Sequence, residues 1–356
     1  DVSGNTLTLE NYDYSVHGAP NPNTIYGGFT RGTGHAKNNT VHIRSGGTVD
    51  SAAGGGTYGG GDVVGNWVYL HAGGLVNGDV SGGSVYGASG SAEGNHVVIE
   101  SGRVNDVIYG GSIGIASTGH ATGNTVKIAG GVIDASVYGG YTNGSGNVTR
   151  NEVTVTGGEI RGSVIGGTNE SPSSTGSVTG NTVTITGGEI RDHVYGGFTK
   201  GDGDVKDNIV NIGDGAHDLA AGTRIDKSIY GGSNDGGSGT ISGNILHVKA
   251  SASAQNIHNF DKINFYFTNT LSPKLTLSDT AGTTIKSLKG ISVNGLPKNM
   301  SGTLIENRSG TITVTDGTSS VTKTGDTAET ILSTDTTRKK IDYTRYIFKG
   351  ARTAES

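Results

Sequence analysis

The chain has 356 residues and a formal net charge of −5 at neutral pH, with 65 glycines, 5 prolines and no cysteine. The absence of cysteine excludes disulfides, metal–thiolate sites and thiol nucleophiles. Because the charges are spread without an acidic or basic block, nothing in the composition favours a nucleic-acid partner. No apolar run approaches the roughly 20 residues of a membrane-spanning helix.

A short motif recurs along the chain and predicts a repeat architecture. In NTVTITGGEIRDHVYGG, residues 181–197, an Asn precedes alternating aliphatic residues, and two Gly-Gly pairs follow. The steps between copies run from 27 residues (Asn124 to Asn151) to 36 residues (Asn208 to Asn244), a period that is typical of solenoids. The leading Asn occupies positions Asn5, Asn39, Asn66, Asn95, Asn124, Asn151, Asn181, Asn208 and Asn244.

Each repeat is expected to build short parallel strands. β-branched residues dominate residues 181–185, which favours a strand with Val183 and Ile185 on its inward face. Gly187-Gly188 and Gly196-Gly197 are expected to form corners, because glycine adopts positive φ without strain. One repeat cannot bury its apolar face alone, whereas stacked copies can pair in parallel. The sequence therefore predicts an all-β fold, a right-handed parallel β-helix, with the handedness taken from the general rule for parallel connections.

Two columns of equivalent residues follow from the repeat. The asparagines are expected to stack as an amide ladder or to cap their turns, and glycosylation is the alternative role. A tyrosine column is expected to point outward, either as a ladder of stacked rings or as an adhesive stripe. Its predicted members are Tyr26, Tyr58, Tyr86, Tyr109, Tyr138, Tyr195 and Tyr230, with Ile165 in the remaining place.

The second, third and fourth copies differ from the others at their outward positions. Aromatic, imidazole and charged residues replace Thr there, and the single Trp of the chain is among them. On one strand face these side chains would form a patch suited to sugar rings or to a protein partner, and packing beneath a loop or cap is the alternative. The candidate ligand-binding residues are His42, Arg44, Trp67, Tyr69, His71 and His96.

No pattern in the sequence indicates catalysis, a metal or a cofactor. Glycoside hydrolysis needs two carboxylates at a fixed separation, whereas residues such as Asp134, Glu159 and Asp192 are scattered among turns and outward positions. His35 and His120 share a TGHA context but lie in copies that are not adjacent, and no second ligand stands at a useful spacing. We therefore expect a non-catalytic protein without metal or cofactor.

The pattern changes near Ile257, and the C-terminal part together with the repeats carries a family resemblance. The GNxVxIxGG copies, FDKINFYF at residues 260–267, GTLIENRSG at residues 302–310 and YIFKG near Tyr346 resemble the passenger domain of bacterial type V autotransporters, which have a pertactin-like β-helix. We accordingly expect β-helix repeats over residues 1–256, then the last coils and a C-terminal β cap over residues 257–356. The resemblance implies that this cap assists folding and that YIFKG is its closing strand.

The resemblance also implies a function, that of a bacterial adhesin. It places the chain at the bacterial cell surface or outside the cell, after export through the outer membrane. The expected partner is a host glycan, a host surface protein or another copy of the chain, as in biofilm formation. Contact with a membrane is expected only through the family's C-terminal outer-membrane barrel, which is missing from this sequence. The alternatives are a β-helix carbohydrate-active enzyme and a structural stalk for an N-terminal head.

Overall fold

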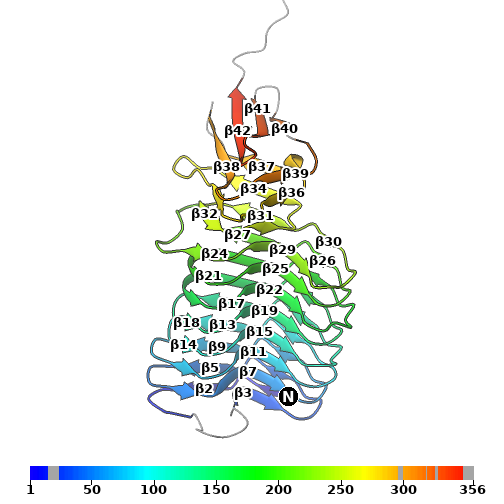
Figure 1. The fold of residues 1–356 in the computed structure, drawn as a ribbon. Coiled ribbons are helices and arrows are strands. Elements are labelled where there is room, and N and C mark those ends of the chain that lie inside the picture. Colours follow the sequence, from blue (N-terminus) through cyan, green and yellow to red (C-terminus); the bar gives the residue numbers. More distant parts are fainter. Residues whose placement is uncertain (15–23, 296–299, 318, 325–327, 348–356) are drawn as a thin grey trace, which may run out of the picture.

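The chain folds into a parallel β-solenoid of about ten turns, which confirms the predicted solenoid. The computed structural model describes residues 1–14, 24–295, 300–317, 319–324 and 328–347. Successive turns climb from the N-terminal end to the C-terminal end of an elongated molecule, as Figure 1 shows. Among the described residues there is no α-helix, only a 3-10 turn at Leu288–Gly290, and no helix is long and apolar enough to cross a membrane.

Three sheets form the walls of the solenoid, and neighbouring strands in each sheet come from successive turns and run parallel. Sheet A contains β1 (Val2–Ser3), β4 (Ala36–Lys37), β8 (Val63–Val64), β12 (Ala92–Glu93), β16 (Ala121–Thr122), β20 (Val148–Thr149), β23 (Val178–Thr179), β26 (Val205–Lys206) and β30 (Ile241–Ser242). Sheet C contains β3 (Thr24–Thr30), β7 (Ser51–Thr57), β11 (Val80–Val85), β15 (Ile108–Ile113), β19 (Val137–Thr142), β22 (Val164–Asn169), β25 (Val194–Thr199), β29 (Ile229–Asn234) and β33 (Ile257–His258).

Sheet B is the longest sheet and has a main row and a shorter second row. The main row contains β2 (Thr6–Leu9), β5 (Thr40–Ile43), β9 (Trp67–Leu70), β13 (His96–Ile99), β17 (Thr125–Ile128), β21 (Glu152–Ile160), β24 (Thr182–Ile190), β27 (Ile209–Ile212), β31 (Ile245–Val248), β34 (Lys262–Tyr266) and β37 (Ile291–Asn294). The second row contains β6 (Thr48–Val49), β10 (Leu75–Val76), β14 (Arg103–Val104), β18 (Val132–Ile133) and β28 (Arg224–Ile225), and it merges with β21 and β24.

A smaller mixed sheet, sheet D, lies at the C-terminal end. Its strands are β32 (Ala252–Ala254), β35 (Leu275–Leu277), β38 (Ser301–Asn307), β42 (Lys340–Ile347), β41 (Ala328–Thr334) and β40 (Ser319–Thr324), in that order. The first three pair in parallel, and the pairs from β38 onward are antiparallel. A separate parallel pair joins β36 (Thr283–Ile285) to β39 (Ile312–Val314). Residues 348–350, which end the YIFKG motif, lie outside the described residues.

Aliphatic side chains fill the interior because the inward positions of every turn are equivalent. Val183 and Ile185 are fully buried, as predicted, and they pair in register with Val153 and Val155 of the preceding turn. Strands paired in this way are about 4.8 Å apart, so each aliphatic residue rests on its own counterpart. Most of the apolar burial belongs to this column-on-column packing.

The nine asparagines form the predicted amide ladder. In eight successive steps, from Asn5 to Asn244, the side-chain nitrogen of one Asn donates to the side-chain oxygen of the next. From Asn39 onward the ladder residues are fully buried. In most turns the same nitrogen also reaches a sheet A carbonyl, for example Ala121 O at 3.0 Å from Asn151 Nδ2. The ladder therefore satisfies buried polar groups at the corner between sheets A and B.

The residue before each ladder Asn makes that corner. It has positive φ in all nine turns, and six of the nine are glycines. Asn38, Arg150 and Asp207 adopt the same conformation with φ between 54° and 56°. Left-handed backbone is unstrained for glycine and costs energy for residues with a Cβ, least for Asn and Asp.

The Gly-Gly pairs after the tyrosine column are not corners, contrary to the prediction. Gly196 and Gly197 lie inside strand β25. The equivalent Gly140 shows why glycine is required, since a Cβ there would lie 2.4 Å from Cγ of Asn151. Sheet C passes directly over the asparagine ladder, and only glycine permits that approach. Gly187 and Gly188 likewise lie inside strand β24 rather than at a corner, although Gly188 has the predicted positive φ, 88°, where the pairing of β24 with β21 shifts register.

Candidate functional site

Five of the six candidate residues form one cluster on the outer face of sheet B, which we call the ring patch (His42, Trp67, Tyr69, His71 and His96). Strand pairing places Trp67 beside His96 and His42 beside Tyr69. The ring centroids of these two pairs are 3.9 Å and 4.8 Å apart, and both pairs are stacked. All five side chains are partly exposed. The predicted adjacency of these residues is therefore confirmed.

The imidazoles of the ring patch are held by hydrogen bonds as well as by stacking. His42 Nδ1 lies 3.0 Å from His71 Nε2, and His71 Nδ1 lies 2.9 Å from Glu100 Oε2. His96 Nδ1 lies 2.7 Å from Thr125 Oγ1. Burial lowers the pKa of His42, and the neighbouring His71 lowers it further. Burial also lowers the pKa of His96, so both rings are neutral at physiological pH.

Arg44 lies at the margin of the ring patch. Its Nη1 is 3.9 Å from Oε2 of Glu10 in the first turn, and both side chains are about half exposed. A contact of this length and exposure is weak. Arg44 is thus a half-exposed cation beside the ring patch rather than part of its stacked rings.

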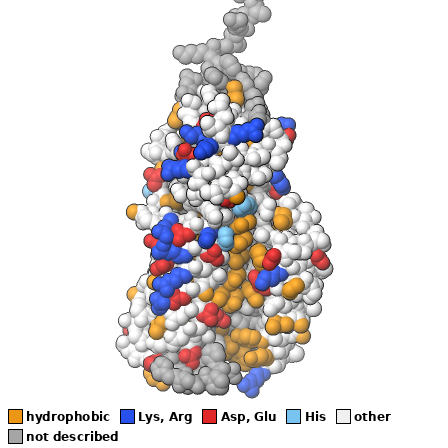
Figure 2. Space-filling model, in the orientation of Figure 1, with side chains coloured by type: hydrophobic (Ala, Val, Ile, Leu, Met, Phe, Trp, Pro, Cys, Tyr) orange, Lys and Arg blue, Asp and Glu red, His pale blue; other side chains and the backbone are white. Residues whose placement is uncertain are grey.

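A second aromatic surface, which sequence reasoning described only in part, covers the outer side of sheet C. We call it the tyrosine face. Figure 2 shows it as a stripe of hydrophobic side chains with a band of charged side chains beside it. Tyr109 stacks on Tyr138 at 5.5 Å, and Tyr195 stacks on Tyr230 at 4.7 Å. Burial raises the pKa of Tyr138 to about 12, so its hydroxyl stays neutral and can donate a hydrogen bond.

The tyrosine column contains six of the eight predicted residues and lacks the other two. Strand pairing gives it the members Tyr26, Ala53, Ser81, Tyr109, Tyr138, Ile165, Tyr195, Tyr230 and His258. Tyr58 and Tyr86, which were expected in this column, instead directly follow strands β7 and β11. The prediction was wrong for these two residues because each precedes a glycine, as the column residues do, whereas backbone pairing decides which residues are equivalent.

The band beside the tyrosine face is a ladder of ion pairs on the outer side of the second row of sheet B. Asp134 accepts from Arg103 and from Arg161 of the neighbouring turns, the latter at 2.7 Å. Glu159 continues the ladder to Arg191 at 3.2 Å. In each of these ion pairs an Arg cation lies against an Asp or Glu carboxylate, so opposite charges alternate along the band.

The tyrosine face has two hollows where its column lacks a ring. The first, of about 280 Å³, lies over Ala53 and Ser81 and reaches Tyr86 and Tyr109, and we call it the serine hollow. The second, of about 390 Å³, lies over Ile165 between Tyr138 and Tyr195, and we call it the isoleucine hollow. Both fall near the lower end of the roughly 300–1,000 Å³ that small-ligand sites occupy.

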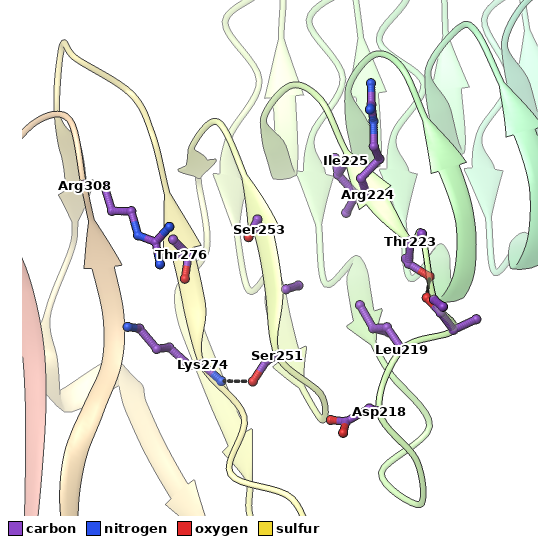
Figure 3. A pocket seen from close by; sticks show the side chains of 14 residues that line it. Asp218, Leu219, Thr223, Arg224, Ile225, Ser251, Ser253, Lys274, Thr276 and Arg308 are labelled. Atoms are coloured by element: carbon purple, nitrogen blue, oxygen red, sulfur yellow. Dashed lines mark hydrogen bonds between the residues drawn. The ribbon is translucent and has the colours of Figure 1, made fainter.

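A larger hollow, of about 520 Å³, lies where sheet B gives way to sheet D (Figure 3). Strand β28 pairs only with β24, so strand pairing is interrupted between β28 in sheet B and β32 in sheet D. Lys274 and Arg308 stand on one side of the hollow and Asp218 on the other. Lys274 Nζ is already bonded to Glu306 at 2.5 Å. No aromatic residue is among the described residues that line this hollow, so it offers no surface for ring stacking.

The three hollows share one feature of their lining. Each is lined by one carboxylate, Asp79 in the serine hollow, Glu170 in the isoleucine hollow and Asp218 in the third. Glu170 is occupied by an ion pair of 2.6 Å with Lys200. Within the part of the chain that the structure describes, no group of three His, Asp or Glu side chains is placed to hold a metal ion.

Comparison with known proteins leaves the chain without an assigned family. No protein-family model, no curated protein sequence and no solved structure matches it significantly.

Proposed function

We propose that the chain is a non-catalytic adhesive rod, exported to the bacterial surface as the passenger of an autotransporter. The observation that carries this proposal is the pair of aromatic lateral surfaces, the ring patch on sheet B and the tyrosine face on sheet C. Exposed aromatic surfaces on a rigid scaffold are suited to contact with glycans or proteins. A solenoid keeps such surfaces in fixed relative positions, because each turn is bonded to the next.

The proposal extends to the winding and to the C-terminal end. We infer a right-handed solenoid, following the rule for parallel crossovers, and a cap of the folding-assisting type built from sheet D. Support for the cap comes from the antiparallel strands β42, β41 and β40, which follow the last parallel strand β38. A solenoid end exposes unpaired strand edges, and antiparallel strands cover them.

A carbohydrate-active enzyme is the second candidate, because one observation favours it. The pKa of Asp79 is raised by partial desolvation at the edge of the hollow and by the nearby carboxylate of Asp106, although the Asp79 residue as a whole is exposed. A carboxyl group with a raised pKa beside a second carboxylate is the arrangement that glycosidases use. Asp106 is exposed and does not line the serine hollow, so we place this candidate second.

The test is attachment by the purified chain, combined with sedimentation velocity. The partner is a host glycan, a host surface protein or a second copy, and the two measurements separate these. Growth of dimers at micromolar concentration identifies self-association. A monomer that binds cells, with binding lost after glycosidase treatment of the cells, identifies a glycan. Trp67→Ala is expected to lower binding if the ring patch makes the contact. A chain that neither self-associates nor binds cells refutes the adhesive function.

A further inference from the structure

Two consecutive turns of the tyrosine face carry only small outward side chains. In β7 these are Ser51, Ala53 and Gly56, and in β11 they include Ser81 and Ser84. The turns before and after carry large rings at the equivalent positions, with Tyr26 ahead of Ala53 and Tyr109 after Ser81. The serine hollow is therefore a gap of two turns in a row of rings.

The ring of Tyr26, which precedes this gap, leans away from the space over Ser81. A Cβ on Gly56 would lie 2.6 Å from Cε1 of Tyr26 and 2.9 Å from Cδ2 of Phe29, so these rings lean across the glycine. The hydroxyl of Tyr26 lies 3.3 Å from that of Tyr86. Tyr26 thus leans toward Tyr86 and does not itself line the hollow, which leaves the space over Ser81 open with Tyr86 at its side. Tyr109 closes the other end.

The floor of the serine hollow holds a polar group without a partner. Ser81 is 5% exposed, and its Oγ makes no hydrogen bond. A buried hydroxyl without a partner is unfavourable, and rotation of the Ser81 side chain toward the hollow would let a ligand hydroxyl satisfy it. Asp79 adds a carboxylate that accepts only a long bond of 3.3 Å from the Val107 backbone. The hollow therefore presents ring walls, an unused hydroxyl and a weakly engaged carboxylate.

We propose that the serine hollow binds one neutral hexose unit of a glycan, an inference that rests on the proposed adhesive function and names its partner. A pyranose ring offers C–H faces that pack on aromatic rings and hydroxyls that bond to Ser81 and Asp79. No Lys or Arg is among the described residues that line the hollow. The carboxylates of Asp79 and Asp106 would repel sialic acid, uronic acids and sulfated sugars.

Saturation-transfer NMR on the full chain tests the inference, with lactose, cellobiose and mannobiose as neutral probes and 3′-sialyllactose as the acidic probe. Ser81→Tyr fills the hollow with the residue that the same column carries at Tyr109. Ile165→Tyr is its matched control, because it fills the isoleucine hollow in the same way. We expect transfer to at least one neutral disaccharide, loss of transfer in Ser81→Tyr, and transfer retained in Ile165→Tyr.

A second variant keeps the test decisive if Ser81→Tyr fails to fold. Ser81→Ala preserves the shape of the hollow and removes the hydroxyl, and it should weaken binding about fivefold, the effect of losing one neutral hydrogen bond. Unchanged affinity in Ser81→Ala, equal loss in both tyrosine variants, or stronger transfer to sialyllactose overturns the inference.

The serine hollow and the adhesive function fail in different ways. Cell attachment that persists in Ser81→Tyr keeps the adhesive function and rejects the hexose site. Disaccharide binding that is accompanied by release of reducing ends, and loses that release in Asp79→Asn, keeps the sugar site and rejects the non-catalytic function.

Discussion

The side-chain oxygen of Asn181 accepts two hydrogen bonds from Asn151 in the preceding turn, one from the backbone nitrogen at 3.0 Å and one from Nδ2 at 2.9 Å. Both residues are fully buried. Asn151 in turn accepts the same two bonds from Asn124. Each ladder Asn therefore serves three turns at once, which ties the stability of neighbouring turns together.

Replacing one ladder residue should be among the most damaging changes in the chain. In Asn151→Ala the backbone nitrogen and Nδ2 of Asn124 lose their acceptor while buried, and each unsatisfied group costs about 1–3 kcal/mol. We expect the free energy of unfolding to fall by about 3 kcal/mol or more, measured by urea denaturation. Thr182→Ala, at a partly exposed outward position, is the control and should stay within about 0.5 kcal/mol of wild type. A loss equal to that of the control would mean that the ladder adds no stability.

Glycine in the middle of the tyrosine strands should be required for steric reasons. In Gly140→Ala the new Cβ would lie 2.4 Å from Cγ of Asn151, a fully buried side chain that is bonded on all sides. Overpacking of this kind costs about 1–3 kcal/mol, so the urea midpoint should fall clearly. Gly32→Ala is the matched control, because nothing lies within 4 Å of its Cβ position. Equal midpoints for the two variants would contradict the close approach of sheet C to the ladder.

One corner should improve on substitution. Arg150 has a φ of 56°, whereas Gly123 and Gly180 fill the equivalent place in the adjacent turns. Left-handed backbone costs a residue with a Cβ about 1–2 kcal/mol, and replacement by glycine relieves that strain. Glycine also raises the conformational entropy of the unfolded chain, which offsets about 0.4–1 kcal/mol of the relief. Arg150→Gly should therefore raise the free energy of unfolding by up to about 1 kcal/mol. Gly123→Ala, which has open space at its Cβ position, should lower it by a similar amount. A fall in stability in Arg150→Gly would show that its side chain outweighs the strain.

The His96 ring of the ring patch should titrate below the usual range of histidine. Burial lowers the pKa of His96, so its neutral form is favoured in the folded state. Stability from this group is present above pH 6.5, the unfolded value, and is lost as the pH falls toward the folded pKa. Trp67, whose ring stacks on His96 at 3.9 Å, is the single Trp and reports the change by fluorescence. We expect a fluorescence step with its midpoint below pH 6.5, which His96→Gln removes. A midpoint above pH 6.5 would contradict the assignment.

The ion-pair ladder beside the tyrosine face should contribute little to the free energy of unfolding. Asp134 is 20% exposed, but its partners Arg103 and Arg161 are nearly half exposed. Solvent screening limits such pairs to about 1 kcal/mol or less. Asp134→Asn is therefore expected to lower the free energy of unfolding by at most that amount. The difference from wild type should shrink at 1 M salt, where the Debye length is about 3 Å. A salt-independent loss of several kcal/mol would indicate a buried network instead.

The sequence predicts correctly those features that depend on alternation within one turn or on the same residue recurring in every turn. Val183 and Ile185 alternate with threonine, and this period alone places them inside. The regular return of Asn predicts the ladder, because identical side chains at one register lie on one another in successive turns. The adjacency of Trp67 and His96 followed from the same register.

The sequence by itself thus determined the repeat, the inward columns and the ladder, since these depend on local periodicity. Only the tertiary structure decided which residues of different turns are equivalent on the tyrosine face, because backbone pairing sets that register and residue likeness does not. Pairing of β7 with β3 places Ala53, and not Tyr58, after Tyr26. The serine hollow exists for that reason. Glycine plays two roles that the sequence does not separate, a left-handed corner at Gly180 and close approach to a buried side chain at Gly140, because the second depends on what lies opposite in space.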